Sequence, residues 1–115
     1  LSLAYARAFA SVIITNVTVY VDNLRDYGWR HGPSCHLIGD SVEELIEFAV
    51  SMGLRREWFQ PKSSPHFDLT ADTRAVAVQN GAVEINQREL VIKLREFREM
   101  RLQLAIDLPG RTDRN

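Results

Sequence analysis

Two histidines and two aspartates are the side chains best suited to act as acids, bases or metal ligands: Asp22, His36, His66 and Asp68. His66 and Asp68 stand two residues apart, so an extended segment places both on one side, because strand side chains alternate between faces. A carboxylate beside an imidazole fixes its tautomer and raises its basicity, and the two groups can also bind a divalent metal ion. We therefore take His36, His66 and Asp68 as candidate catalytic residues, and Asp22, His66 and Asp68 as candidate metal ligands.

Each of these residues also has a structural interpretation. Asp68 could cap the helix that follows while His66 bonds a backbone carbonyl, and structural ion pairs resemble functional ones. Asp22 ends a predicted strand, where acidic residues of open α/β sheets commonly face a ligand crevice. Asp22-Asn23 also suits an Asx-turn that closes the strand. Asn23 is grouped with Asp22 as a candidate ligand-binding residue, and both interpretations stay open.

His36 follows the only cysteine of the chain, Cys35, on a predicted strand. Neighbours on a strand point to opposite faces, so a core-facing Cys35 turns His36 outward or into a cleft. A cysteine nucleophile would need a second feature that lowers its pKa. One cysteine and three histidines at irregular spacing match no common structural zinc pattern. The sequence therefore favours neither a cysteine-based catalyst nor a structural zinc site.

Arginines and aromatic residues gather in the predicted loops around these candidates. The candidate ligand-binding residues are Asp22 and Asn23 at the end of the first predicted strand, Arg55, Arg56 and Trp58 in a loop, and Arg74 on the second predicted helix. Arg25, Trp29, Arg30, His31 and Lys62 also lie in the loops around the candidates. Guanidinium groups beside an indole suit a phosphate-bearing or planar ligand such as a nucleotide, through paired hydrogen bonds and stacking. The alternative is a solvated surface in which Trp58 and Phe59 fill the core, and for Phe59 this alternative is favoured. The chain contains no Walker loop and no G-x-G-x-x-G motif.

The elements that must position these residues are strands alternating with helices. The predicted strands are 12–22, 35–38 and 82–85, and one further strand is either 57–60 or 67–69; the predicted helices are 42–52, 71–80 and 87–106. Capping residues support the helices, for example Ser41 with Glu44 at the first and Asn86 with Glu89 at the third. We predict an α/β fold: a small mixed sheet of three to four strands covered by about three helices in a single domain.

Composition sets the class of protein. The 115 residues are 45% hydrophobic and 25% charged with a net charge of −1, as expected for one globular domain with its own core. This charge does not indicate nucleic-acid binding, and no apolar run reaches the ~20 residues that a membrane helix needs. A single cysteine makes a reducing cytoplasm the simplest compartment. We divide the chain into an N-terminal extension (1–16), an α/β domain (17–108) and a flexible tail (109–115).

Several blocks of the chain resemble one family. They include Val19-Tyr20-Val21-Asp22-Asn23, Cys35-His36-Leu37-Ile38, Trp58-Phe59-Gln60, His66-Phe67-Asp68-Leu69 and Gly81-Ala82-Val83-Glu84-Ile85. In this order they resemble DUF4031, a family of small bacterial and phage domains of unknown function, over roughly residues 17–87. The resemblance implies a family-like core at 17–87 followed by a C-terminal helix at 87–106, and it implies no reaction. The chain departs from the family pattern in the loop after Asn23 and in a longer loop before His66.

Two functional hypotheses follow from the sequence. The first is a pocket protein, a metal-assisted hydrolase of a phosphate-bearing or nucleotide-like substrate, in which Asp22, His36, His66 and Asp68 converge around a divalent ion. The second is a non-catalytic binding or assembly module that forms a homodimer through its C-terminal helix. The first requires His36 and His66 to lie close enough to share a ligand. The second gains support if the helix exposes Leu90, Leu94 and Phe97.

Overall fold

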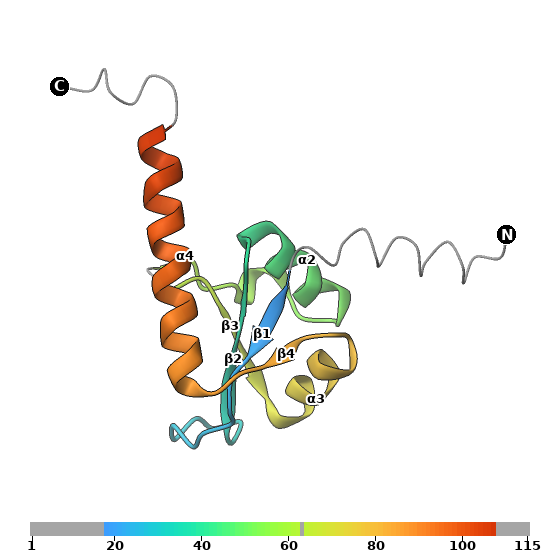
Figure 1. Cartoon of the computed structure of the whole chain (residues 1–115). Helices are drawn as coiled ribbons and strands as arrows, with labels where there is room; N and C mark the ends of the chain where they lie inside the picture. Colours follow the sequence, from blue (N-terminus) through green and yellow to red (C-terminus); the bar gives the residue numbers. More distant parts are fainter. Residues whose placement is uncertain (1–17, 63, 108–115) are drawn as a thin grey trace, which may run out of the picture.

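The computed structural model describes residues 18–62 and 64–107, which form a four-stranded mixed sheet with helices on both faces (Figure 1). This confirms the predicted α/β class. In chain order the elements are β1 (Val19–Val21), β2 (Ser34–Gly39), α2 (Val42–Ser51), a 3-10 turn η1 (Arg56–Trp58), β3 (Phe67–Thr70), α3 (Ala71–Gln79), β4 (Val83–Glu84) and α4 (Gln87–Asp107).

The strands lie in the order β3-β2-β1-β4. β1 pairs antiparallel with β2 and parallel with β4, and β2 pairs antiparallel with β3. The parallel pair arises because α2, β3 and α3 intervene between β1 and β4, whereas a loop alone joins β1 to β2. Within the β2–β3 pair, His36 stands opposite Asp68. The sheet register therefore brings together two candidate residues that are far apart in sequence.

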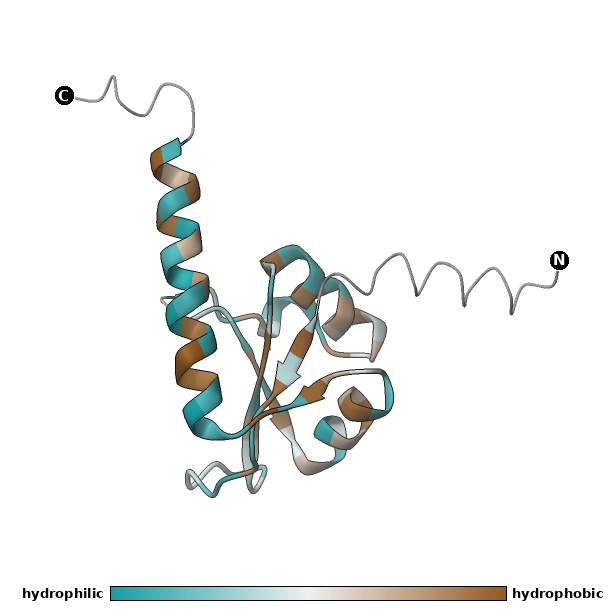
Figure 2. Ribbon diagram, in the orientation of Figure 1, coloured by the Kyte–Doolittle hydropathy of each residue, from teal (hydrophilic) through white to brown (hydrophobic). Residues whose placement is uncertain are grey.

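Helices cover both faces of the central strand β1, which explains why its three residues are all hydrophobic and buried. Val19 and Val21 point toward α2 and α3, where they join one apolar cluster with Leu45 and Phe67. Tyr20 points the other way and packs with Ile38 and with residues of α4 in a second cluster. Figures 1 and 2 show this division, with α4 on one side of the strands and α2 and α3 on the other.

The residues predicted to cap the helices do so in the structure. The Ser41 side chain accepts from the backbone N–H of Glu44 at the start of α2, and Gly53 takes a positive φ of 95° just beyond its end. At α4, Asn86 and Glu89 cap each other reciprocally, at 2.8 and 2.9 Å. These local hydrogen bonds satisfy N–H groups that a helix start leaves without partners.

The structure narrows two strand predictions. Of the predicted strand 12–22, residues 12–17 lie outside the described part of the chain, and among residues 18–22 the strand is Val19–Val21. The uncertain strand is Phe67–Thr70, while Arg56–Trp58 forms a 3-10 turn. The reason is that Gln60 pairs with His66 in an antiparallel bridge, so the chain turns back between them before β3 begins. The predicted extension 1–16 and tail 109–115 lie outside the described residues.

The helix α4 packs on the sheet with only part of its length. Leu90 is buried, and Leu94 and Phe97 pack against the Tyr20 cluster, so the three residues proposed for assembly serve the domain core. The outer half of α4 extends past the sheet (Figure 1). It carries exposed apolar side chains at Met100, Leu102, Leu104 and Ile106. No helix among the described residues is long and apolar enough to cross a membrane.

Candidate metal site

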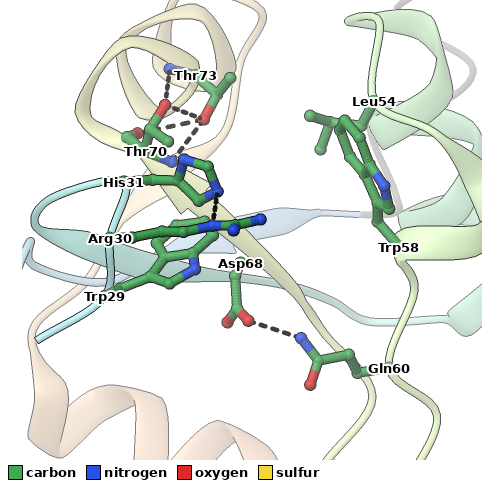
Figure 3. A pocket seen from close by; sticks show the side chains of 9 residues that line it. All are labelled: Trp29, Arg30, His31, Leu54, Trp58, Gln60, Asp68, Thr70 and Thr73. Carbon is green, nitrogen blue, oxygen red and sulfur yellow. Dashed lines mark hydrogen bonds between the residues drawn. The ribbon is translucent and has the colours of Figure 1, made fainter. Parts of the chain in front are cut away.

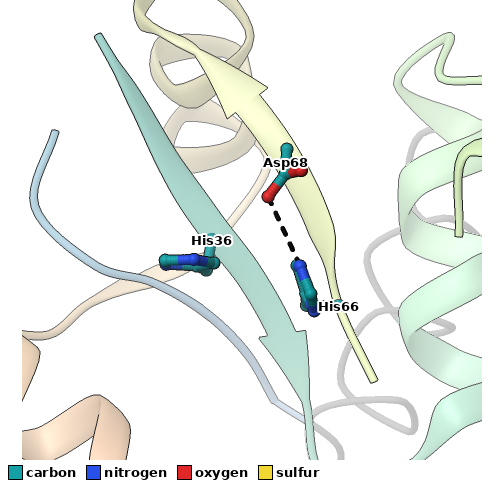
Figure 4. A group of neighbouring side chains, drawn as sticks. All are labelled: His36, His66 and Asp68. Carbon is teal, nitrogen blue, oxygen red and sulfur yellow. Dashed lines mark ion pairs between the residues drawn. The ribbon is translucent and has the colours of Figure 1, made fainter. Parts of the chain in front are cut away.

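His36, His66 and Asp68 come together on the sheet face that carries α4 (Figure 4). His36 and Asp68 are register partners on β2 and β3, and His66 lies two residues before Asp68 on the same side of the chain. The His36 and His66 rings meet edge to face with centroids 5.3 Å apart. The two imidazoles are thus close enough to share a ligand, as the first hypothesis requires.

Asp22 accepts two hydrogen bonds from His36. Its carboxylate is 1% exposed and accepts the backbone N–H of His36 at 2.6 Å and, through its other oxygen, the ring Nδ1 of the same residue at 3.0 Å. A carboxylate only accepts, so the Nδ1 atom carries a proton and the lone pair of a neutral ring lies on Nε2. The hydrogen bond from Asp22 raises the pKa of His36, and partial burial opposes this shift. Asp22 therefore fixes both the orientation and the tautomer of His36.

His66 is fixed in the same tautomer by a different acceptor. Its Nδ1 lies 2.6 Å from the backbone carbonyl oxygen of Ser64, which only accepts. Its Nε2 lies 3.4 Å from Oδ1 of Asp68. A neutral His66 consequently turns a lone pair toward a carboxylate oxygen, an arrangement that a proton or a bound cation between the two atoms would stabilise.

Gln60 completes the surroundings of Asp68. Its amide nitrogen donates to Oδ2 of Asp68 at 2.6 Å, which orients the carboxylate and leaves the Oδ1 atom for His66 or a cation. Gln60 reaches this position because its backbone pairs with His66 across the turn. Sequence analysis missed this role. Gln60 belongs to the block Trp58-Phe59-Gln60 that resembles the family, but neither that block nor its spacing to His66 indicates a contact with Asp68.

The arrangement fits a divalent transition-metal ion. One nitrogen of each ring and one oxygen of Asp68 all lie within 4.8 Å of one another. A zinc-type ion with bonds of about 2.0–2.2 Å holds its ligand atoms roughly 3.0–3.5 Å apart, so binding would draw the three together by about 1–2 Å. Both Nδ1 atoms already bond to acceptors, as the second ring nitrogen of a metal-binding histidine almost always does. Two imidazoles and one carboxylate suit zinc, iron or manganese and leave coordination positions open for water.

The other predicted site residues lie elsewhere. Both oxygens of Asp22 are engaged by His36, so Asp22 lies behind the site, in the position of a residue that supports a ligand. Arg74 donates to the carbonyl oxygen of Asp22 at 2.8 Å and to Glu84 at 3.0 Å, which joins α3 to β1 and β4. Arg55 pairs loosely with Glu57 on the exposed surface. Asn23 and Arg56 are exposed. Their predicted roles in ligand binding stay predictions.

A cavity of about 560 Å³ opens beside Asp68 (Figure 3). Its lining residues are Trp29, Arg30, His31, Leu54, Trp58, Gln60, Asp68, Thr70 and Thr73. Asp68 and Gln60 belong both to this cavity and to the candidate metal site, so the two adjoin each other. Trp58 was predicted to bind ligand and does line the cavity. Of the three loop residues 29–31, the sequence indicated only that they lay near the candidates.

Cys35 contributes to the core and takes no part in the site chemistry. Burial, with the nearby charge of Asp22, raises the pKa of its thiol from 9.0 to about 12. The thiolate is the nucleophilic form, so this shift makes Cys35 less reactive at neutral pH than an ordinary cysteine. The expectation that Cys35 faces the core is confirmed, since its side chain belongs to the cluster beneath α2 and α3.

The fold and site together define a small α/β domain with two histidines and an aspartate gathered on one sheet face. The family model described as "Protein of unknown function (DUF4031)" matches residues 19–97, more than half of the chain. The protein belongs to the DUF4031 family. No curated protein and no solved structure matches the chain.

Proposed function

We propose that the protein binds a divalent metal ion through His36, His66 and Asp68 and uses it to hydrolyse a phosphate ester. The observation that carries this proposal is the contact of each histidine Nδ1 with an oxygen that only accepts, from which the tautomer follows. Each ring donates from Nδ1 to a fixed acceptor, Asp22 or the carbonyl of Ser64, and so keeps the lone pair of Nε2 available. A hydrogen bond from the ring nitrogen that does not bind the metal orients a ligating histidine and increases its basicity.

The reaction type follows from the number and kind of ligands. Three protein ligands leave open positions, and a metal in such a site supplies a bound water of lowered pKa and polarises a phosphoryl oxygen. Gln60 holds the Asp68 carboxylate, and its Oε1 atom can accept a hydrogen bond from a bound water or hydroxyl group. Arg30, which lines the adjoining cavity, adds a positive charge for a phosphate group.

An assay of phosphate-ester hydrolysis tests this proposal. The full chain is incubated with bis-p-nitrophenyl phosphate and with p-nitrophenyl phosphate, in the presence of Zn²⁺ or Mn²⁺ and in the presence of EDTA. We expect metal-dependent release of nitrophenol, and we expect Asp68→Asn to lower the rate at least 100-fold, because the loss of a charged ligand removes the ion or misplaces it.

The matched control for this assay is Glu57→Gln, which removes an exposed carboxylate on the neighbouring turn η1. It should leave the rate unchanged. Hydrolysis that is insensitive to EDTA, or equal in the Asp68→Asn variant and the wild type, would contradict the proposal. So would a metal-loaded protein that cleaves neither ester.

An assembly module is the second candidate function, and the outer half of α4 favours it. Four large apolar side chains there are exposed, and the end of the helix that carries them extends past the sheet (Figure 1). A homodimer that pairs these segments would bury them. The oligomeric state of the wild type, measured in solution beside a Leu102→Glu/Ile106→Glu variant, distinguishes a dimer of this kind from a monomer.

A further inference from the structure

Both tryptophans of the chain line the cavity beside the candidate metal site. Trp29 comes from the loop between β1 and β2, Trp58 comes from the turn η1, and they stand on opposite sides of the cavity (Figure 3). Trp58 is 52% exposed and Trp29 is 39% exposed. Indoles gain much from burial, so two exposed indoles around one cavity form a natural binding surface for a planar ring.

The remaining walls supply apolar contacts and few free polar groups. Leu54 is buried next to Trp58 (Figure 3). The hydroxyl groups of Thr70 and Thr73 bond to each other at 3.0 Å and to the backbone at the start of α3, so they are already used by the helix cap. A ligand in this part of the cavity is therefore held mainly by ring and methyl contacts.

Arg30 gives the cavity its charge preference. Its guanidinium points into the cavity (Figure 3), and its Nε donates to Nε2 of His31 at 3.3 Å. Among the residues that the structure describes, no acceptor contacts its two terminal nitrogens. The His31 ring in turn packs edge-on against the Trp29 ring, with centroids 4.6 Å apart. His31 thus contacts both Arg30 and Trp29. A guanidinium with free terminal nitrogens suits a phosphate.

We propose that this cavity binds a nucleotide, with its base against Trp29 and Trp58 and its phosphate between Arg30 and the metal ligands. The volume of about 560 Å³ accommodates such a ligand. The phosphate end of this proposal rests on the proposed metal centre, which shares Asp68 and Gln60 with the cavity. The proposed position of the base depends only on Trp29 and Trp58, so it can be tested separately.

Binding of a small ligand panel tests the proposal. The full chain, with Zn²⁺ and separately with EDTA, is titrated with adenosine 5′-monophosphate, adenosine, ribose 5-phosphate and a short single-stranded oligonucleotide. Tryptophan fluorescence and calorimetry are the readouts. Since the chain has only two tryptophans, any quenching by a base reports on the cavity.

We expect the nucleotide to bind and to quench the fluorescence. We expect ribose 5-phosphate to bind at least tenfold more weakly, and Trp58→Ala to weaken nucleotide binding roughly tenfold, the typical effect of losing one stacking partner. Arg30→Gln should weaken the nucleotide but leave adenosine unchanged. Leu102→Ala, at an exposed apolar position on α4, should alter neither. If the oligonucleotide binds more tightly than the mononucleotide and this binding also depends on Trp58, the proposal is supported. The bound nucleotide would then be one unit of a nucleic-acid strand.

Equal binding of ribose 5-phosphate and nucleotide would overturn the proposal, as would affinities that Trp58→Ala leaves unchanged or a panel that does not bind at all. The metal content of each variant separates the two proposals. A protein that binds metal but no nucleotide overturns only this inference. One that binds nucleotide through Trp58 but no metal overturns only the proposed metal centre.

Discussion

Replacing Asp22 with asparagine is expected to weaken metal binding by about 10- to 100-fold while the fold is preserved. The asparagine oxygen can still accept the backbone N–H of His36, as Oδ1 of Asp22 does at 2.6 Å. Its amide group then replaces the carboxylate oxygen that faces Nδ1 at 3.0 Å. An amide only donates at that position, so His36 moves its proton to Nε2 and loses the lone pair that a metal needs.

The change is measured by titrating the metal-free protein with Zn²⁺ against a competing chelator. The ¹⁵N chemical shifts of the His36 ring report its tautomer independently. A general loss of stability would not move the proton from Nδ1 to Nε2. Asp26→Asn is the matched control in the same loop, because Asp26 accepts the N–H of Gly28 through one oxygen and asparagine can do the same. Equal zinc affinity in the wild type and the Asp22→Asn variant would show that Asp22 does not support a ligand.

Replacing Phe67 with alanine is expected to lower the free energy of unfolding by about 3–5 kcal/mol. Phe67 is 0% exposed and is the largest fully buried side chain among the described residues, and it packs against the Phe59 ring at a centroid distance of 5.6 Å. Its removal leaves a cavity in the cluster beneath α2 and α3. Because domains of this size are stable by only about 5–15 kcal/mol, the loss is a large part of the total.

Urea denaturation of both proteins measures this difference. Ile92→Ala serves as the control, since Ile92 is exposed on α4 and its truncation should cost less than about 1 kcal/mol. Phe67 lies between His66 and Asp68 with its side chain on the opposite face of β3, so the variant also shows whether the site depends on the core beneath it. A loss below about 1 kcal/mol for Phe67→Ala would mean that the cluster repacks around the gap.

The helices could be predicted from sequence because their signals are local. Helix caps involve only neighbouring residues. Ser41 and Asn86 make the N-cap hydrogen bonds that their side chains predict, and Gly53, just after the end of α2, adopts the positive φ typical of glycine there. β3 was harder to place. The segments 57–60 and 67–69 have similar composition, and the choice between them depends on the Gln60–His66 bridge.

The site could be predicted only in part, because its members meet through sheet register. The His66-x-Asp68 pair is visible in the sequence, since strand alternation places both side chains on one face. That His36 faces Asp68 depends on which residues of β2 and β3 pair, and no local pattern encodes this register. The long-range role of Arg74, which bonds the backbone of Asp22, is hidden for the same reason. A sequence shows which residues have suitable chemistry, and the pairing of strands decides which of them meet.

The central claim is that His36, His66 and Asp68 bind one metal ion, and metal titration tests it most directly. The metal-free chain is titrated with Zn²⁺ by calorimetry and its metal content is then measured, beside His66→Ala and the surface control His31→Ala. We predict one ion per wild-type chain and per His31→Ala chain, and at least a 100-fold lower affinity for His66→Ala. A wild-type protein that binds no ion, or a His66→Ala variant that binds zinc as tightly as the wild type, would contradict the account.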